Sequence, residues 1–186
     1  AGEPLYSLAV DGVNEVVYLH SHGNRRIQQI TFDQTLSLLP QSLLYVHDME
    51  ADPDSGTLFY TEDVGPEGLF KSGLDGTGAA TLSSDSGVQR NLAFSQARNN
   101  LIYSVASTGV GGVSSLYSID TDGSNKLLLG NVSGAVEDVD IDDEDGVLFW
   151  TVADGIWQSP RDSISPTLVV TSTTGSITDL ALIKIV

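Results

Sequence analysis

Four stretches of the chain repeat one pattern, in which a short acidic or polar strand runs into a turn and then into an aromatic strand. The copies are Leu8 to Leu19, Met49 to Thr61, Leu92 to Ser104 and Val139 to Thr151. At intervals of 42 to 47 residues, one aromatic column joins the copies: Tyr18, Tyr60, Tyr103 and Trp150. A period of this length made entirely of strands is typical of the blades of a β-propeller.

The second copy separates into four short strands divided by turn residues. The expected strands are Tyr45 to Asp52, Thr57 to Glu62, Gly68 to Leu74 and Ala79 to Ser83, and Pro, Gly and Asp residues fill the gaps between them. No stretch of the chain has convincing helical periodicity. We therefore expect an all-β fold, a propeller-like array of about four antiparallel blades with four strands each.

The repeats predict one propeller domain over residues 1–186. Its repeats cover about 5–44, 45–87, 88–134 and 135–175, and a closing strand at 176–186 repeats the inner-strand pattern of the first copy. Three arrangements stay open: a closed four-bladed propeller, a piece of a larger propeller, and an open array that a second copy completes. The third would make a homodimer one of the expected assemblies, because an unclosed array exposes apolar blade faces.

The composition excludes several classes of partner. The 25 acidic and 8 basic residues give a formal net charge of −17, which repels nucleic acids and anionic lipid. No apolar run approaches the 18 residues that a membrane-spanning helix needs, so we expect no membrane insertion. Without cysteine, neither disulfides nor thiolate metal ligands can hold the fold. The charge attracts cationic partners and divalent ions, and it also simply favours solubility.

The third strands align in two columns. One column holds Ile27, Leu69, Leu116 and Ile156, and the next holds Gln28, Phe70, Tyr117 and Trp157. Blades packed face to face must bury both faces of each sheet, which requires large apolar side chains at equivalent points. We expect these aromatic residues, Tyr117 and Trp157 included, to belong to the core and not to serve as platforms for a ligand.

An aromatic pair followed by Thr, with a strand ending in Asp-Gly-Ser/Thr about fifteen residues later, resembles the YWTD repeat, also called the LDL-receptor class B repeat. The segments that carry the resemblance are Phe59-Tyr60-Thr61-Glu62, Phe149-Trp150-Thr151, Leu74-Asp75-Gly76-Thr77 and Asp120 to Lys126. The motifs are degenerate, since the family's Asp appears as Glu62 and is replaced by His20, Val105 and Val152 elsewhere. The resemblance implies an extracellular, non-enzymatic recognition domain, generally of six blades.

The inner strands place oxygen-bearing side chains in one column before the apolar one: Ser7, Asp48, Asn91, Asp138 and Asp179. Inner strands line the central channel of a propeller, so these side chains could converge there. Converging carboxylates need a cation or protons, and Ca²⁺ takes six to eight oxygen ligands. We therefore predict a calcium site formed by Asp48, Asn91, Asp138 and Asp179. The alternative is that these side chains bond nearby backbone.

A second acidic cluster comprises Glu137, Asp138, Asp140, Asp142, Asp143, Glu144 and Asp145. It lacks the Asp-x-Asp-x-Asp-Gly pattern of a calcium loop. We expect most of it to be a solvated turn.

The sequence offers little for catalysis. There are three histidines, His20, His22 and His47, and no nucleophile elbow, phosphate loop or paired-His zinc motif. We predict a secreted or extracellular binding module that presents loops to a protein or glycan partner, and we favour this reading over an enzyme. The alternatives are a metal-dependent propeller hydrolase similar to the lactonases, and a multivalent lectin.

Overall fold

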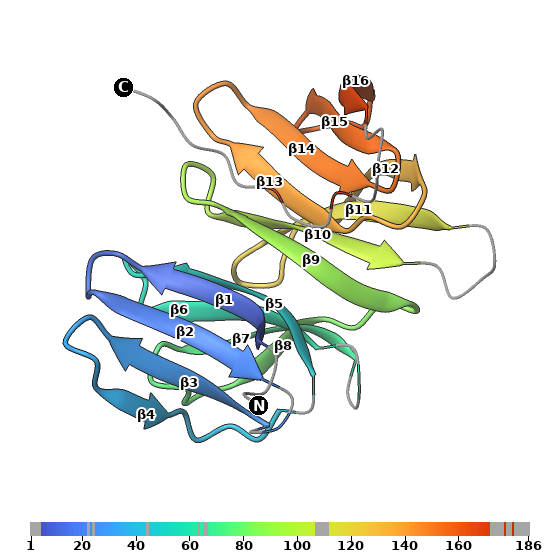
Figure 1. Ribbon diagram of the computed structural model, residues 1–186. Helices are drawn as coiled ribbons and strands as arrows, with labels where there is room; N and C mark the ends of the chain where they lie inside the picture. The colour runs from blue at the N-terminus through green and yellow to red at the C-terminus, as the bar shows by residue number, and fades with distance from the viewer. Residues whose placement is uncertain are drawn as a thin grey trace. The chain divides into compact units, whose positions relative to one another are not determined.

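The computed structural model describes residues 5–21, 23, 25–43, 45–62, 64, 67–106, 112–171, 177 and 180. All regular structure in these residues is β-strand, in four antiparallel sheets of four strands each (Figure 1). The chain forms two compact units, Ala1–Arg90 and Asn91–Val186, whose boundary falls within the first strand of the third sheet. No helix suited to crossing a membrane occurs in the part of the chain that the structure describes. The predicted all-β array of four four-stranded sheets is confirmed.

The first unit holds two sheets whose strands are hydrogen-bonded in sequence order. The first sheet comprises β1 (Leu5–Asp11), β2 (Val16–Ser21), β3 (Arg26–Thr31) and β4 (Leu36–Leu38). The second comprises β5 (Val46–Asp52), β6 (Thr57–Glu62), β7 (Gly68–Gly73) and β8 (Ala80–Ser83). The strands predicted for the second repeat are therefore correct to within one residue at each end.

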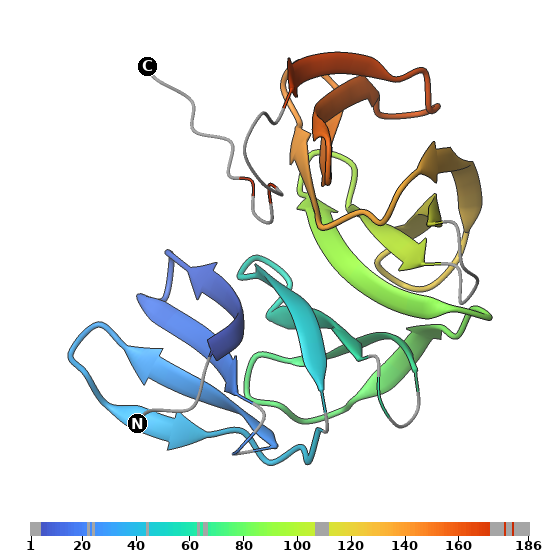
Figure 2. The same ribbon diagram turned by 45° about the vertical axis from the view of Figure 1, so that its right-hand side comes forward.

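The third and fourth sheets follow the same order, as the green to red strands of Figure 2 show. The third comprises β9 (Val88–Ser95), β10 (Asn100–Ala106), β11 (Val113–Asp120) and β12 (Leu127–Ser133). The fourth comprises β13 (Asp138–Asp142), β14 (Val147–Val152), β15 (Gly155–Pro160) and β16 (Thr167–Thr171). Apart from Ile177 and Leu180, the predicted closing strand lies outside the described residues.

The strand register corrects one column of the sequence alignment. Met49 pairs with Tyr60 and Val139 pairs with Trp150, whereas the equivalent Leu8 pairs with Leu19 and not with Tyr18. Leu19 therefore occupies the aromatic position in the first sheet, and by the same one-residue shift Ser21, not His20, is the residue equivalent to Glu62. The shift was invisible in the sequence because Tyr18 and Leu19 are both large and adjacent.

The turns repeat as closely as the strands. The last turn residue before each second strand has positive φ: 57° at Glu15, 69° at Gly56, 53° at Asn99 and 66° at Gly146. Its carbonyl accepts a hydrogen bond from the first residue after the third strand, in the pairs Phe32 to Glu15, Leu74 to Gly56, Thr121 to Asn99 and Arg161 to Gly146. Each sheet therefore ties its first and third turns together without using a side chain.

Within each unit, the two sheets pack through opposite faces. We call the face that carries Leu8, Met49, Leu92 and Val139 the leading face of its sheet, and the opposite face the trailing face. In the first unit, Met49, Leu58 and Tyr60 of the second sheet's leading face pack on Ala9 and Tyr18 of the first sheet's trailing face. The second unit repeats this contact with Val139, Leu148 and Trp150 against Ala93 and Ile102.

A matched pair of glycine substitutions tests the positive φ at the end of the first turn. Neither Gly12 nor Gly56 has a heavy atom within 4 Å of an added Cβ, but only Gly56 has positive φ, at 69°. We expect Gly56→Ala to lower the free energy of unfolding by about 1–2 kcal/mol, the cost of left-handed backbone. Gly12→Ala should stay neutral or stabilise by up to about 1 kcal/mol. Urea unfolding measures both, and equal effects would contradict the backbone argument.

Candidate binding site

Three of the predicted calcium ligands, Asp48, Asn91 and Asp138, form hydrogen bonds with other residues of the chain. Asp48 Oδ1 accepts from the Met49 N–H at 2.9 Å. The Asn91 amide donates to the Glu137 carbonyl, and its oxygen accepts from the Ser104 hydroxyl at 2.8 Å. Asp138 accepts from the N–H groups of Val139 and Leu180, at 2.8 and 2.6 Å. Except for the bond from Ser104, these partners are backbone groups, the kind of partner that the alternative interpretation names.

The calcium site itself stays a prediction. Asp48 belongs to the first unit, Asn91 and Asp138 belong to the second, and Asp179 lies outside the described residues. Within the described ranges, no three His, Asp or Glu side chains gather closely enough to hold an ion. Of the histidines, His20 is fully buried in β2 and His22 lies outside the described residues.

The acidic cluster is divided between two structural roles. Asp142 Oδ1 accepts from the N–H groups of Glu144 and Asp145, at 3.0 and 3.1 Å, and so caps its own turn. Asp11 and Asp52 cap the equivalent turns of the first unit in the same manner. Asp143, Glu144 and Asp145 lie in this turn as expected, and the last two are exposed, whereas the Asp143 carboxylate is held by hydrogen bonds from outside the turn.

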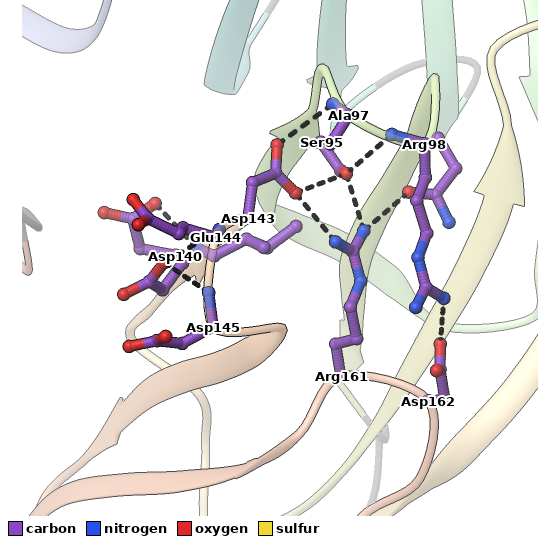
Figure 3. Close-up of polar contacts among 12 residues, drawn as sticks. Ser95, Ala97, Arg98, Asp140, Asp143, Glu144, Asp145, Arg161 and Asp162 are labelled. Atoms are coloured by element: carbon purple, nitrogen blue, oxygen red, sulfur yellow. Dashed lines mark hydrogen bonds and ion pairs between the residues drawn. The ribbon is translucent and has the colours of Figure 1, made fainter.

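Asp143 reaches across to the turn of the third sheet, where Ser95 stands in place of a capping Asp. Its carboxylate accepts from the Ser95 hydroxyl at 2.5 Å and from the Ala97 N–H at 3.2 Å. Ala97 is equivalent to Val13, whose N–H bonds Asp11 of its own turn. The fourth sheet thus supplies the carboxylate that the third sheet lacks (Figure 3).

Arg161 completes this polar contact from the turn between β15 and β16. Its side chain, 3% exposed, donates to Asp143 at 2.7 Å, to Ser95 at 2.6 Å and to Asn100 at 3.2 Å. Burial of Asp143 opposes its ionisation, but the bonds from Ser95, Ala97 and Arg161 outweigh burial and hold its pKa below the usual range. The buried guanidinium needs this carboxylate, since an unpaired buried charge is costly.

We expect Asp143→Asn to lower the free energy of unfolding near pH 7 by about 3 kcal/mol, the low end for breaking a buried pair, because Asp143 keeps 29% exposure. A lowered folded pKa gives stability that is full above the unfolded pKa of about 4 and is lost as pH falls through the folded value. The variant should lack this part of the acid dependence in denaturant unfolding from pH 7 to pH 2.

The exposed pair of Asp162 with Arg98, whose side chains are 68% and 49% exposed, provides the control. Asp162→Asn should change the free energy of unfolding by less than about 1 kcal/mol. If the two variants lost equal stability, the buried pair of Asp143 with Arg161 would contribute no more than the exposed pair, contrary to the prediction.

A cavity of about 270 Å³ lies in the second unit, beside the end of β12 and the hairpin between β14 and β15. Its apolar lining is Val132, Trp150, Val152, Trp157 and Pro166, and its polar lining is Ser133 and Asp154. The indole N–H of Trp157 donates to the Asp154 carboxylate at 3.1 Å, which fixes the ring at the wall. Concave apolar surface with a few polar groups is what binding sites share.

The cavity adds a second role to one residue of the aromatic columns. Trp157 is half-buried and packs against the core cluster that contains Trp150, as expected, but it also lines the cavity. Tyr117 instead stacks on Tyr103, with 5.7 Å between ring centroids. The sequence contained one signal for this difference, since Asp154 precedes Trp157 by three residues across a two-residue turn.

No protein-family model and no curated protein matches the sequence. Among solved structures, a chain in a crystal structure of a nidogen/laminin complex is similar with a TM-score of 0.78 and 19% identity, over 87% of this chain and 62% of that one. A putative TolB from Agrobacterium tumefaciens is similar with a TM-score of 0.77 and 14% identity, over 91% and 63%.

The gluconolactonase XC5397 from Xanthomonas campestris is similar with a TM-score of 0.68 and 18% identity, over 91% of this chain and 62% of that one. The chain thus spans less than two thirds of the length of each of these three structures. At such identities the likeness establishes the fold and not the activity. The chain has a β-propeller-type fold built from four blade-like sheets.

Proposed function

We propose that this chain is an extracellular binding module that recognises another protein through an apolar side chain held in the Trp150 and Trp157 cavity. The cavity is the observation that carries the proposal. Its volume of about 270 Å³ lies below the roughly 300–1,000 Å³ usual for drug-sized ligands, which suits a single anchoring side chain. The propeller fold supports this reading, since a similar chain was crystallised in a nidogen/laminin complex.

The lining favours an apolar anchor over a sugar. Five of the seven residues that line the cavity are apolar, and apart from the indole N–H groups only Ser133 and Asp154 contribute polar side-chain atoms. A sugar ring would bring several hydroxyl groups that two polar side chains cannot satisfy, and each buried unsatisfied group is costly. A leucine or phenylalanine side chain loses no hydrogen bond on entering.

Charge adds a preference for a basic partner. The net charge of −17 attracts cationic surfaces and raises the rate of encounter with them. Asp154, at the polar part of the cavity lining, is exposed and places a carboxylate next to the anchor. We therefore expect the anchoring side chain to be flanked by lysine or arginine.

Intrinsic fluorescence tests the proposal directly, because both tryptophans of the chain line the cavity. The probes are two cationic pentapeptides, one with leucine and one with alanine between flanking lysines. Burial of a leucine side chain contributes about 1.5–3 kcal/mol, so the leucine peptide should bind roughly tenfold or more tightly. Equal affinities, or no change in fluorescence with either peptide, would contradict an apolar anchor site.

A matched pair of variants locates the binding. Ser133→Phe places a ring against the cavity and should abolish the preference for leucine, whereas Thr167→Phe adds the same ring to an exposed position of β16 that does not line it. Thr167→Phe should bind like the unmodified chain. If both variants kept the preference, the peptide would be binding elsewhere.

A further inference from the structure

We propose that Asn131 is an N-glycosylation site and that its glycan projects from the outer strand of the third sheet, away from the cavity. The inference rests on the extracellular location in the proposed function, since asparagine-linked sugars are added to proteins that enter the secretory pathway. Its test measures glycan mass and not peptide binding, so the two proposals can fail separately.

Asn131-Val132-Ser133 is the Asn-x-Ser/Thr triplet that an oligosaccharide transferase recognises, and its middle residue is not the excluded proline. No other asparagine of the chain has serine or threonine two residues later. Because so short a triplet also arises by chance, the placement of Asn131 in the structure decides whether it can carry a sugar.

Asn131 lies on β12, the outer strand of the third sheet, and its side chain is exposed. Gly130 precedes it along the strand, and Ser115 stands opposite it on β11. A glycan is bulky and hydrated, so it needs an exposed anchor without large side chains next to it. The position of Asn131 meets both requirements.

The amide of Asn131 is oriented for substitution at its nitrogen. Oδ1 accepts a hydrogen bond from the Ser115 hydroxyl at 2.8 Å, and Nδ2 donates to no group among the described residues. Other asparagines use Nδ2 as a donor within the protein: Asn14, Asn91 and Asn125. A sugar on Nδ2 of Asn131 would therefore displace no hydrogen bond of the fold.

The reaction is a glycosyl transfer from a lipid-linked oligosaccharide pyrophosphate. Nδ2 attacks C1 of the first sugar, the bond between C1 and the pyrophosphate oxygen breaks, and Nδ2 gives up one proton. The lipid pyrophosphate leaves with the bonding electron pair, so no oxidant or reductant takes part. The product amide keeps Oδ1 as the acceptor for Ser115.

Strand alternation directs the glycan away from the cavity. Leu116 and Val132 face the core of the second unit, and Val132 also lines the cavity. Ser115 and Asn131 are a ladder pair and precede these two residues by one position each, so their side chains leave the opposite face of the sheet. The glycan should therefore leave the cavity open.

Intact mass after secretion from a eukaryotic host provides the test. The chain, preceded by a cleavable secretion signal, should gain one oligosaccharide that peptide N-glycosidase removes. Release in heavy-oxygen water converts the modified asparagine to labelled aspartate, and the label should lie at position 131. Asn131→Gln and Ser133→Ala should carry no glycan, whereas Ser133→Thr should keep it because threonine supplies the same hydroxyl.

Leu127→Ser provides a control for the transferase of the host. It completes the same triplet at Asn125, and Leu127 is 55% exposed, so this variant should fold and carry two glycans. If the chain of natural sequence is secreted without a glycan, the proposal is overturned. A single glycan at Asn125 in Leu127→Ser would overturn it as well.

Peptide binding tests the direction of the glycan. The glycosylated chain and Asn131→Gln should both prefer the leucine pentapeptide by roughly tenfold or more. A preference found only in Asn131→Gln would place the glycan over the cavity and overturn its proposed direction. If neither chain prefers leucine while residue 131 carries the glycan, the proposed binding function fails and the glycosylation site stands.

Discussion

The structure depends on one constraint, which is that the apolar side chains of the two sheets within a unit are buried against each other. Each unit meets it by packing a leading face on a trailing face, with Met49 and Tyr60 against Ala9 and Tyr18 in one unit and Val139 and Trp150 against Ala93 and Ile102 in the other. Burying a side chain as large as Trp150 contributes several times as much as a single surface hydrogen bond. The turns and polar contacts therefore act on an arrangement that apolar packing establishes.

Polar groups make this packing specific. Ser95 is shorter than the Asp residues that cap the other turns, and Asp143 of the adjoining sheet fills the place of the missing carboxylate. Arg161 then neutralises that carboxylate under the protein surface. Asp143 can accept hydrogen bonds from Ser95 and Ala97 only when the two sheets are in register. The contact therefore favours one alignment of the third sheet on the fourth over a slipped one.

Much of the fold could be predicted from the sequence, because local patterns determine it. The alternation of apolar and polar residues, together with the Asp-Gly turns, predicted the strands of the second repeat to within one residue at each end. The column of Tyr18 was misplaced because two adjacent large residues fit the pattern equally well and only the ladder separates them. The role of Asp143 was missed since it depends on a neighbouring sheet, although Ser95 in a position otherwise held by Asp was a usable signal. The cavity beside Trp157 required three-dimensional packing.

The alternation of the inner strands has a consequence for how such a chain can change in size. Small or neutral residues occupy the trailing inner positions of the first and third sheets, and acidic residues occupy those of the second and fourth. The chain is therefore a tandem of two sheet pairs, not of four interchangeable modules. Loss of a whole pair would leave the packing within the other pair unchanged. Loss of the first or third sheet alone would expose the apolar leading face of the second or fourth sheet, which that sheet covers.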